Sequence, residues 1–415
     1  MLDSSIFKDM FGTAAMRAVF DDAATVYRYT ETEIALAKVQ GKLGVIPSQA
    51  ADVIAQKADS TKLDMVELKR ETEIVGYPIL PLVHQLSKMC GPEGEYLHWG
   101  ATTQDIMDTA TVLQVRAGLA IIETDLNELD QILDALAAQY RDAPMAGRTH
   151  LQHALPITFG YKVAVWLLMV RRHRERLLQL KPRVLIGQFG GAAGTLASLG
   201  SQGLAVHAAL MTELELEAAP VTWHVARDGL TETIQFLALV TGSLGKIALD
   251  IMLMMTNELG EAFEPFVKGR GASSTMPQKR NPISCELMLS ASKAVRQHAG
   301  LALDAMVQKP VSAAVVTTAA PVGATTAAPA ATTEPAAAAL TSAREQLAQT
   351  ELLRCIFGNP FRPATFSPEW RTDTAVSLAR GMYEARDFSA MPQNLTMAST
   401  ALSLTEDVYL AISVL

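Results

Sequence analysis

The sequence predicts an all-α protein built around a bundle of long helices. Apolar residues recur at alternating steps of three and four from Val112 to Tyr140, and the stretch from Leu230 to Glu261 is apolar on nearly every side. Few segments show the period of two that is typical of strands. These patterns favour a central long-helix bundle over residues 109–308, preceded by an N-terminal helical domain over residues 1–108.

The first of these helices carries an apolar seam without a gap. The seam consists of Val112, Val115, Leu119, Ile122, Leu126, Leu129, Leu133, Leu136 and Tyr140. At 1.5 Å per residue it predicts a helix seam about 45 Å long that packs in the manner of a coiled coil. The segment from Asp142 to Pro144 is expected to end this helix, and a second helix is expected from about Pro156 to Leu180.

The next two helices follow a glycine-rich segment. Residues Val184 to Thr212 carry no charge when His207 is neutral, but their many glycines favour a turn between buried helices over a membrane span. The helix over Leu230 to Glu261 has almost no polar face, which predicts burial by further subunits in an oligomer. A further helix is expected from Pro282, where proline costs no hydrogen bond, to about Gln308.

The composition changes after this helix. Residues Val311 to Leu340 are rich in alanine, threonine and proline, a composition that buries little surface. We interpret residues 309–342 as a linker and residues 343–415 as a small C-terminal helical segment.

Composition and charge exclude several classes of function. The 415 residues carry a net charge of −8, which argues against a general nucleic-acid binder. Cys90, Cys285 and Cys355 are too widely spaced for a disulfide framework or a paired-cysteine metal site. The N-terminus shows no secretory pattern, so we expect a cytoplasmic protein that binds neither membrane nor nucleic acid.

Three motifs occur in order along the chain. They are HWGATTQDIMDT at residues 98–109, GRTHLQHALP at residues 147–156 and GASSTMPQKRNP at residues 271–282. The last resembles the signature loop of the aspartase/fumarase superfamily, S-S-x-M-P-x-K-x-N, and the resemblance covers about residues 16–308. The segments FGGAAGTLASLG at residues 189–200 and TWHVARDGLTE at residues 222–232 resemble the 3-carboxy-cis,cis-muconate cycloisomerase branch, whose nearest sister is adenylosuccinate lyase.

This resemblance implies a homotetrameric enzyme with no metal or other cofactor that acts on a small polycarboxylate. The expected reaction is lactone formation from 3-carboxy-cis,cis-muconate, by acid/base chemistry next to a carboxylate. A lyase that releases fumarate and a helical scaffold without turnover are the alternatives. After Gln308 the chain lacks the family's later basic segment, which weighs against a nucleotide substrate.

The resemblance assigns the catalytic base to Ser273, with Ser274 as the alternative. A serine hydroxyl is a poor base at neutral pH, so the loop must surround it with backbone N–H groups, near Lys279 and the positive start of the next helix. Lys279 and Asn281 stand two residues apart and are implied to bind one substrate carboxylate. For an isolated pair of serines, an ordinary Gly/Ser turn would be the competing interpretation.

The second motif supplies a histidine and its neighbours. The resemblance makes His150 a catalytic residue whose carboxylate partner is Glu286, and it places Thr149 and Gln152 among the substrate ligands. A glutamate that orients an imidazole allows it to act as an acid or to activate water.

The first motif supplies a candidate general acid, His98. The competing interpretation is a packed histidine of the core. Thr102, Thr103 and Gln104 are implied to donate to substrate carboxylates, and Asp105 and Asp108 are expected to cap the helix that follows. Arg17 aligns with a residue that meets an anion in related enzymes, although it could equally be a surface arginine.

Overall fold

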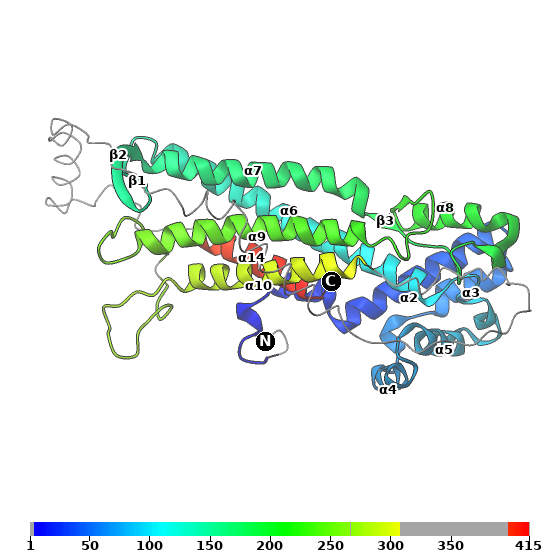
Figure 1. Ribbon diagram of the computed structural model, residues 1–415. Coiled ribbons are helices and arrows are strands. Elements are labelled where there is room, and N and C mark those ends of the chain that lie inside the picture. Colours follow the sequence, from blue (N-terminus) through cyan, green and yellow to red (C-terminus); the bar gives the residue numbers. More distant parts are fainter. Residues whose placement is uncertain (1–3, 266, 308–396, 415) are drawn as a thin grey trace, which may run out of the picture. The chain divides into compact units, whose positions relative to one another are not determined.

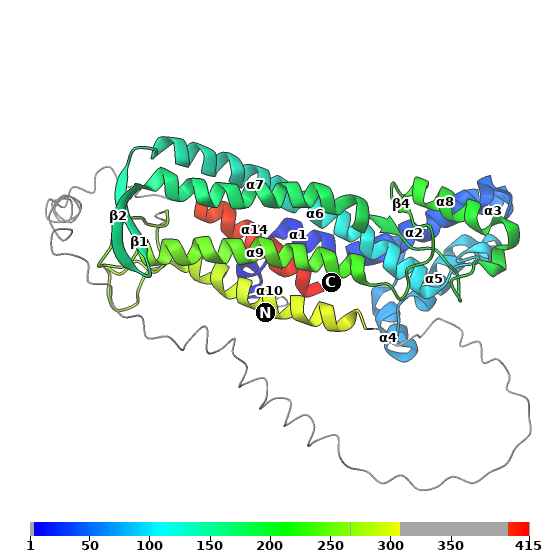
Figure 2. The same cartoon turned by 45° about the horizontal axis from the view of Figure 1, so that its top comes forward.

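Five long helices lie side by side in the computed structural model and form the bundle (Figures 1 and 2). They are α6 (Thr103–Gln139), α7 (Phe159–Val184), α9 (Asp228–Met254), α10 (Ile283–Ala305) and α14 (Met397–Val414). The structure describes residues 4–265, 267–307 and 397–414, which all belong to one compact unit. The all-α prediction is confirmed, and the predicted linker and residues 343–396 lie outside the described residues.

Helix α6 is the spine of the bundle. It is 37 residues long, and its predicted seam is buried from Val112 to Leu133, with Leu136 and Tyr140 half-buried at its end. The helix begins at Thr103, so the predicted boundary between residues 108 and 109 falls inside it. Its seam packs against α7 and α14, with the ring of Trp166 fully buried in the same core.

Most of the N-terminal helices lie around the first part of α6, at the end of the bundle opposite the hairpin described below, whereas the helix Ala14–Phe20 packs against α6 and α14 further along the bundle (Figures 1 and 2). Side-chain caps start three of the α-helices: Thr13 accepts the backbone N–H of Met16, Asp21 accepts that of Ala24, and Asp64 accepts those of Val66 and Glu67. The elements are η1 (Lys8–Met10), α1 (Ala14–Phe20), α2 (Asp22–Lys42), α3 (Ser48–Lys57), η2 (Ser60–Lys62), α4 (Met65–Val75), α5 (Ile79–Cys90) and η3 (Gly91–Tyr96).

The glycine-rich segment forms a connection between helices, as predicted. It contains η4 (Ala197–Gln202) and α8 (Gly203–Glu213), and a short parallel pair, β3 (Ile186–Gly187) with β4 (Glu217–Ala218), brackets it. Leu199, Val206 and Leu210 pack with residues of α2 and α6 in a separate small core.

An antiparallel hairpin that the periodicity did not reveal joins α6 to α7. Its strands are β1 (Pro144–Thr149) and β2 (Gln152–Thr158). His150 and Leu151 form its two-residue turn with φ of 48° and 63°, the conformation of a type I′ turn. Because this turn lacks its usual glycine or asparagine, no residue pattern indicated a hairpin here. The second helix accordingly starts at Phe159 and not at Pro156.

Helix α9 is the apolar helix that was predicted from Leu230 to Glu261, but it ends at Met254. It is long and apolar enough to cross a membrane by length and composition, yet half of its most apolar window is buried against the other bundle helices α7, α10 and α14. Leu239, Leu249 and Leu253 remain exposed on it. An exposed apolar face of this kind is typical of a surface that packs against another chain.

Helix α14 packs into the bundle against α6, α9 and α10. Leu404 and Val408 are fully buried in the core that also holds Leu126 and Leu129 of α6. The sequence predicted a small C-terminal helical segment, and nothing in its pattern indicated that a helix there would complete this core.

A pair of carboxyl groups joins α14 to α6. The side chains of Asp125 and Asp407 share a hydrogen bond, so one of the two must hold a proton. Asp407 also accepts hydrogen bonds from the backbone N–H and the hydroxyl of Thr13. Burial and the charge of Asp407 raise the pKa of Asp125 to about 7. Burial also raises the pKa of the neighbouring Glu406, to about 7.

The first prediction concerns this shared proton. A carboxyl group whose pKa is higher in the folded than in the unfolded state stabilises the fold. This contribution is complete at pH values below the unfolded pKa and is lost as the pH rises to the folded pKa, here about 7. The melting temperature should therefore fall between about pH 4, the unfolded value, and about pH 7, the folded value, and level off above it. In Asp125→Asn the amide donates to Asp407 at every pH, so the fall should be smaller, with Glu406 accounting for what remains.

Thermal unfolding followed by circular dichroism at three pH values measures this effect. Asp134→Asn is the matched control, because it removes an exposed carboxylate of the same helix that pairs with Arg171. If Asp125→Asn and wild type lost the same stability over this range, the shared proton would not link α14 to the bundle.

Candidate functional site

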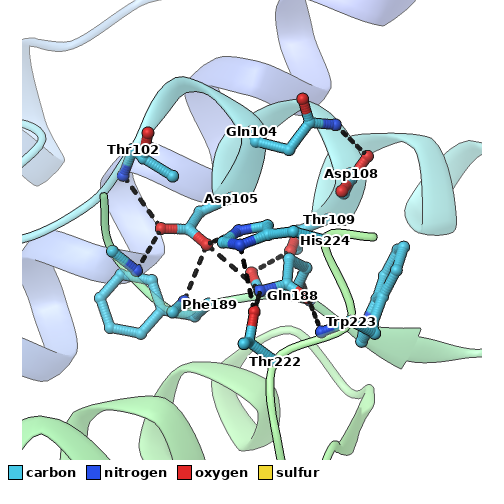
Figure 3. A network of polar contacts seen from close by, with 12 residues as sticks. Thr102, Gln104, Asp105, Asp108, Thr109, Gln188, Phe189, Thr222, Trp223 and His224 are labelled. Carbon is cyan, nitrogen blue, oxygen red and sulfur yellow. Dashed lines mark hydrogen bonds and ion pairs between the residues drawn. The ribbon is translucent and has the colours of Figure 1, made fainter. Parts of the chain in front are cut away.

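The start of α6 is held by one buried carboxylate, that of Asp105 (Figure 3). It accepts the backbone N–H groups of Thr102 at 2.9 Å, Gly190 at 2.8 Å and Gly191 at 2.9 Å, and it lies 2.7 Å from Nε2 of His224. Four donors compensate the cost of burying this charge. Asp105 therefore fastens the first motif to two segments from later in the chain.

The glycine turn fits this arrangement because side chains would not. Gly191 has φ of 71°, and a Cβ atom on Gly190 would lie 2.7 Å from Oγ1 of Thr222. Thr222 in turn accepts a hydrogen bond from Nε2 of Gln188 at 2.6 Å. The glycines thus serve close packing around Asp105.

Asp108 organises a second part of this cluster. Its Oδ1 accepts hydrogen bonds from Gln104 at 2.7 Å and from Arg227 at 2.8 Å, and Arg227 stacks over the ring of Trp223. Burial raises the pKa of Asp108, although the bond to Arg227 opposes the shift. Asp108 accordingly orients Gln104 and does not cap the helix, whereas Asp105 does make the predicted contact with the helix start.

His98 and the predicted ligands Thr102 and Thr103 lie in the same region. Nδ1 of His98 is 2.6 Å from Oε1 of Glu33 on α2. Burial alone would lower the pKa of His98, but the charge and hydrogen bond of Glu33 outweigh it and raise this pKa. The ring of His98, the backbone N–H of Thr102 and the amide of Gln104 each therefore bind a buried carboxylate.

The second motif lies at the tip of the β1–β2 hairpin. His150 forms the turn, and Thr149 and Gln152 pair across the strands beside it; all three are exposed. Arg148 forms a largely buried double hydrogen bond with Glu261, one arm of which is 2.7 Å. This ion pair ties the hairpin to the chain that leads into the signature loop.

The signature loop runs between α9 and α10, at the hairpin end of the bundle (Figures 1 and 2). Oγ of Ser273 accepts hydrogen bonds from the backbone N–H groups of Thr275 at 3.3 Å and Met276 at 3.1 Å. Donors of this kind are expected around a serine that loses its proton. Lys279 is exposed. The side chain of Asn281 closes the loop by donating to the carbonyl of Gly271 at 3.0 Å.

The start of α10 differs from expectation. The backbone N–H groups of Ser284 and Cys285 bind the buried carboxylate of Glu264, at 3.2 and 2.7 Å. The positive end of this helix is therefore neutralised by Glu264 and is not turned toward Ser273. Glu286 is exposed on the first turn of α10, and among the described residues no hydrogen bond joins it to His150.

Arg17 lies on α1, where it serves its own N-terminal segment. Its guanidinium donates to the carbonyls of Lys8 and Gly12 and pairs with Asp9 at 2.5 Å. The structure does not bring it to the other candidate residues within this chain.

The candidate residues form two groups at opposite ends of α6. His98 and Thr102 to Gln104 lie at its start, whereas His150 and the signature loop lie beyond its end (Figure 1). Thirty-seven helical residues separate the two groups by about 55 Å. A single chain thus presents two partial sites, neither of which holds all three motifs.

An open cavity of about 600 Å³ lies elsewhere, between α2, α3 and the segment before β4. Its lining includes Tyr27, Lys38, Arg116 and Glu213 and none of the predicted site residues. Arg116 is occupied there, because it donates to the carbonyls of Leu214 and Glu215. We therefore place the candidate chemistry at the motif residues.

Sequence reasoning missed Glu33, Gln188, His224 and Glu264. The signal for Glu33 was present: Val26, Thr30, Glu33, Ala37 and Gln40 follow steps of four and three and are all buried on one face of α2. A charged residue within such a stripe requires a partner. The other three lie in loops, where no periodicity marks burial.

Comparison with known proteins agrees with the motifs. The lyase family matches residues 9–296. Trans-aconitate decarboxylase 1 of Mycosarcoma maydis is 49% identical over 299 residues, which cover 72% of this chain and 61% of that protein. The 3-carboxy-cis,cis-muconate cycloisomerase of Pseudomonas aeruginosa is 44% identical over 293 residues, which cover 70% and 64%.

A crystal structure of fumarate lyase from Mesorhizobium sp. BNC1 superposes with a TM-score of 0.67 at 54% identity, over 72% of this chain and 67% of that chain. The match spans less than two thirds of both curated relatives named above. Because the family match spans residues 9–296 and the identity to trans-aconitate decarboxylase 1 is 49%, the protein belongs to the lyase family of the aspartase/fumarase superfamily.

Proposed function

We propose that the protein is an enzyme that moves a proton at the carbon next to a carboxylate of a small unsaturated tricarboxylate. The observation that carries this proposal is the signature loop, where two backbone N–H groups donate to Oγ of Ser273. Such donors stabilise the negative charge that a serine base must carry. An exposed lysine, Lys279, supplies positive charge six residues further on.

The proposed roles follow from the atoms available. Ser273 exchanges the proton with the carbon, and Lys279 holds the substrate carboxylate whose charge increases as that proton leaves. The amide nitrogen of Asn281 carries a second N–H beyond the one bound to Gly271, and this donor is suited to the same carboxylate. In lactone formation one carbon of the double bond receives the carboxylate oxygen and the other receives a single proton from Ser273, and His98 supplies that proton by reprotonating Ser273 afterwards.

The reaction that we propose first is formation of a lactone from 3-carboxy-cis,cis-muconate. Two relatives, the cycloisomerase and trans-aconitate decarboxylase 1, are named for unsaturated tricarboxylates. The donors at the motifs are hydroxyl, amide and ammonium groups, which suit several carboxylates on a compact molecule. Decarboxylation of trans-aconitate is the second candidate, because that relative has the higher identity, 49%.

We further propose that the working site forms between chains of a homotetramer. The two partial sites lie about 55 Å apart along α6, farther than any small substrate can bridge. Exposed apolar side chains continue along α7 at Tyr161, Val165 and Leu168, at helical spacing, beside those of α9. Burying these faces would bring the start of α6 in one chain to the loop end of another.

The second prediction tests the substrate. Purified protein without added metal or nucleotide should remove the conjugated-diene absorbance of 3-carboxy-cis,cis-muconate and leave adenylosuccinate unchanged. Release of carbon dioxide from trans-aconitate is measured in parallel. Turnover of trans-aconitate alone would replace the lactone reaction with the second candidate, and turnover of adenylosuccinate alone would contradict the tricarboxylate proposal.

The third prediction tests the base. Ser273→Ala should lower kcat by at least about a hundredfold, as expected for loss of one acid/base group. Ser274→Ala is the matched control, because Ser274 is adjacent and exposed and is expected to keep most activity. The opposite ranking of the two variants would move the base to Ser274. Light scattering on both variants confirms that assembly is unchanged.

The fourth prediction tests the shared site. His98→Asn and Ser273→Ala should each be inactive, but mixed chains that are unfolded and refolded together should recover up to about a quarter of wild-type activity, because some sites then contain both intact residues. Each variant refolded alone is the control. A monomer in light scattering, or no recovery in mixed tetramers, would place each site within one chain.

A further inference from the structure

Two polar side chains of α2 reach the first motif from its buried side. Glu33 and Gln40 stand seven residues apart on the buried face of this helix. Oε1 of Glu33 lies 2.6 Å from Nδ1 of His98, and Nε2 of Gln40 donates to the carbonyl of Trp99 at 2.7 Å. Helix α2 thus contacts two successive residues of HWG, one through a ring and one through the backbone.

The backbone at this motif is held in an unusual conformation. His98 has φ of 60° and Gly100 has φ of 77°. A non-glycine residue in the left-handed region persists only where surrounding contacts fix it. The contacts to α2 provide that restraint, so the position of the imidazole is set by residues outside the motif.

Exposure differs sharply across the Glu33–His98 contact. The side chain of Glu33 is 0% exposed, whereas that of His98 is 23% exposed. Because Nδ1 faces Glu33, Nε2 is the ring nitrogen left for substrate, and it makes no hydrogen bond among the described residues. The ring therefore connects a buried charge to an accessible nitrogen.

The second carboxylate oxygen of Glu33 also bears on whether its partner His98 is protonated. Oε2 is buried and has no hydrogen-bond partner within the described part of the chain. A buried carboxylate with a single neutral donor would be costly, whereas an imidazolium partner compensates the charge. The charged groups that face His98 are Glu33 from α2 and Asp105 from α6, and both are acidic.

We propose that Glu33 is a positioning residue that orients His98 with Nε2 toward the substrate and keeps its imidazole protonated. This inference rests on the proposed function for the role of His98 as proton donor. In that step Ser273 gives its proton to the substrate carbon, the Nε2 proton of His98 passes to the serine oxygen, Nδ1–H stays bound to Glu33, and solvent then returns a proton to Nε2. Gln40, in contrast, supports only the backbone.

Titration of His98 tests the proposal directly in the intact protein. Histidine labelled with ¹³C at Cε1 gives one signal for each of eight histidines, and the signal missing in His98→Asn identifies His98. In wild type it should titrate above the ordinary value of about 6.5. In Glu33→Gln, which keeps the shape but loses the charge, the pKa should fall by about one unit or more.

Gln40→Met is the matched control, since it removes the other contact from α2 and leaves the charges around His98 in place. It should leave the His98 titration unchanged. If substrate is turned over, the alkaline limb of kcat/KM should move to lower pH in Glu33→Gln and stay in place in Gln40→Met, because the protonated form of His98 is the active one.

The outcomes separate the two proposals. A wild-type His98 that titrates at or below about 6.5, or an equal titration in wild type and Glu33→Gln, overturns the role of Glu33 whatever the activity. A shifted titration together with no turnover of any substrate supports the role of Glu33 and overturns the proposed function alone. The wild-type measurement decides the question even if Glu33→Gln fails to fold.

Discussion

The length of α6 is the constraint on which the rest of the structure depends. This helix contributes Leu126 and Leu129 to the bundle core, Ile106 to the N-terminal core and Val112 to the small core beside α8. It is therefore one rigid element shared by all three cores. Because the first motif lies at its start and the second follows its end, its 37 residues keep the residues of the two motifs apart. The proposal that each site needs a second chain follows from this single dimension.

Buried and half-buried carboxylates recur at helix starts and within helices, and their partners decide what each one does. Asp105 has four donors and fixes a helix start, and Glu264 binds the free N–H groups of α10. Glu33 has one partner, an imidazole, and Asp125 shares a proton with another carboxyl. A carboxylate held mainly by backbone N–H groups serves the fold, as Asp105 does although His224 also contacts it, whereas one whose only partner is an imidazole stabilises the charged form of that ring. By this criterion Glu33 is the carboxylate to associate with chemistry.

Much of the fold could be read from periodicity. The seam from Val112 to Leu133 is buried as expected, because a helix that packs on others repeats every three to four residues. The type I′ turn could not be predicted, since His150 and Leu151 are unusual residues at positive φ. The packing of α14 was also not predictable, because it depends on contacts with helices far earlier in the chain, for example that of Thr400 with Glu128 of α6 at a separation of 272.

The motifs predicted candidate residues for the site, but not every group that surrounds those residues. The environment of Ser273 agrees with the expectation that backbone N–H groups surround its hydroxyl, since that requirement follows from chemistry alone. The carboxylate beside His98 was missed because it comes from α2, sixty-five residues earlier in the chain. A motif contains residues that are neighbours in sequence, whereas the groups that set the charge of those residues come from distant parts of the chain.

Helix α14 bears on how the bundle core is completed in this chain. The family match ends at residue 296, before the end of α10, and α14 comes from beyond it. Nevertheless α14 buries Leu404 and Val408 against α6 and so closes the bundle core. The hairpin and the signature loop are attached to helices α6, α7, α9 and α10, whose spacing this core determines. A sequence outside the family match can therefore hold the motif loops in register, because the core requires apolar volume on one helical face and not a particular sequence.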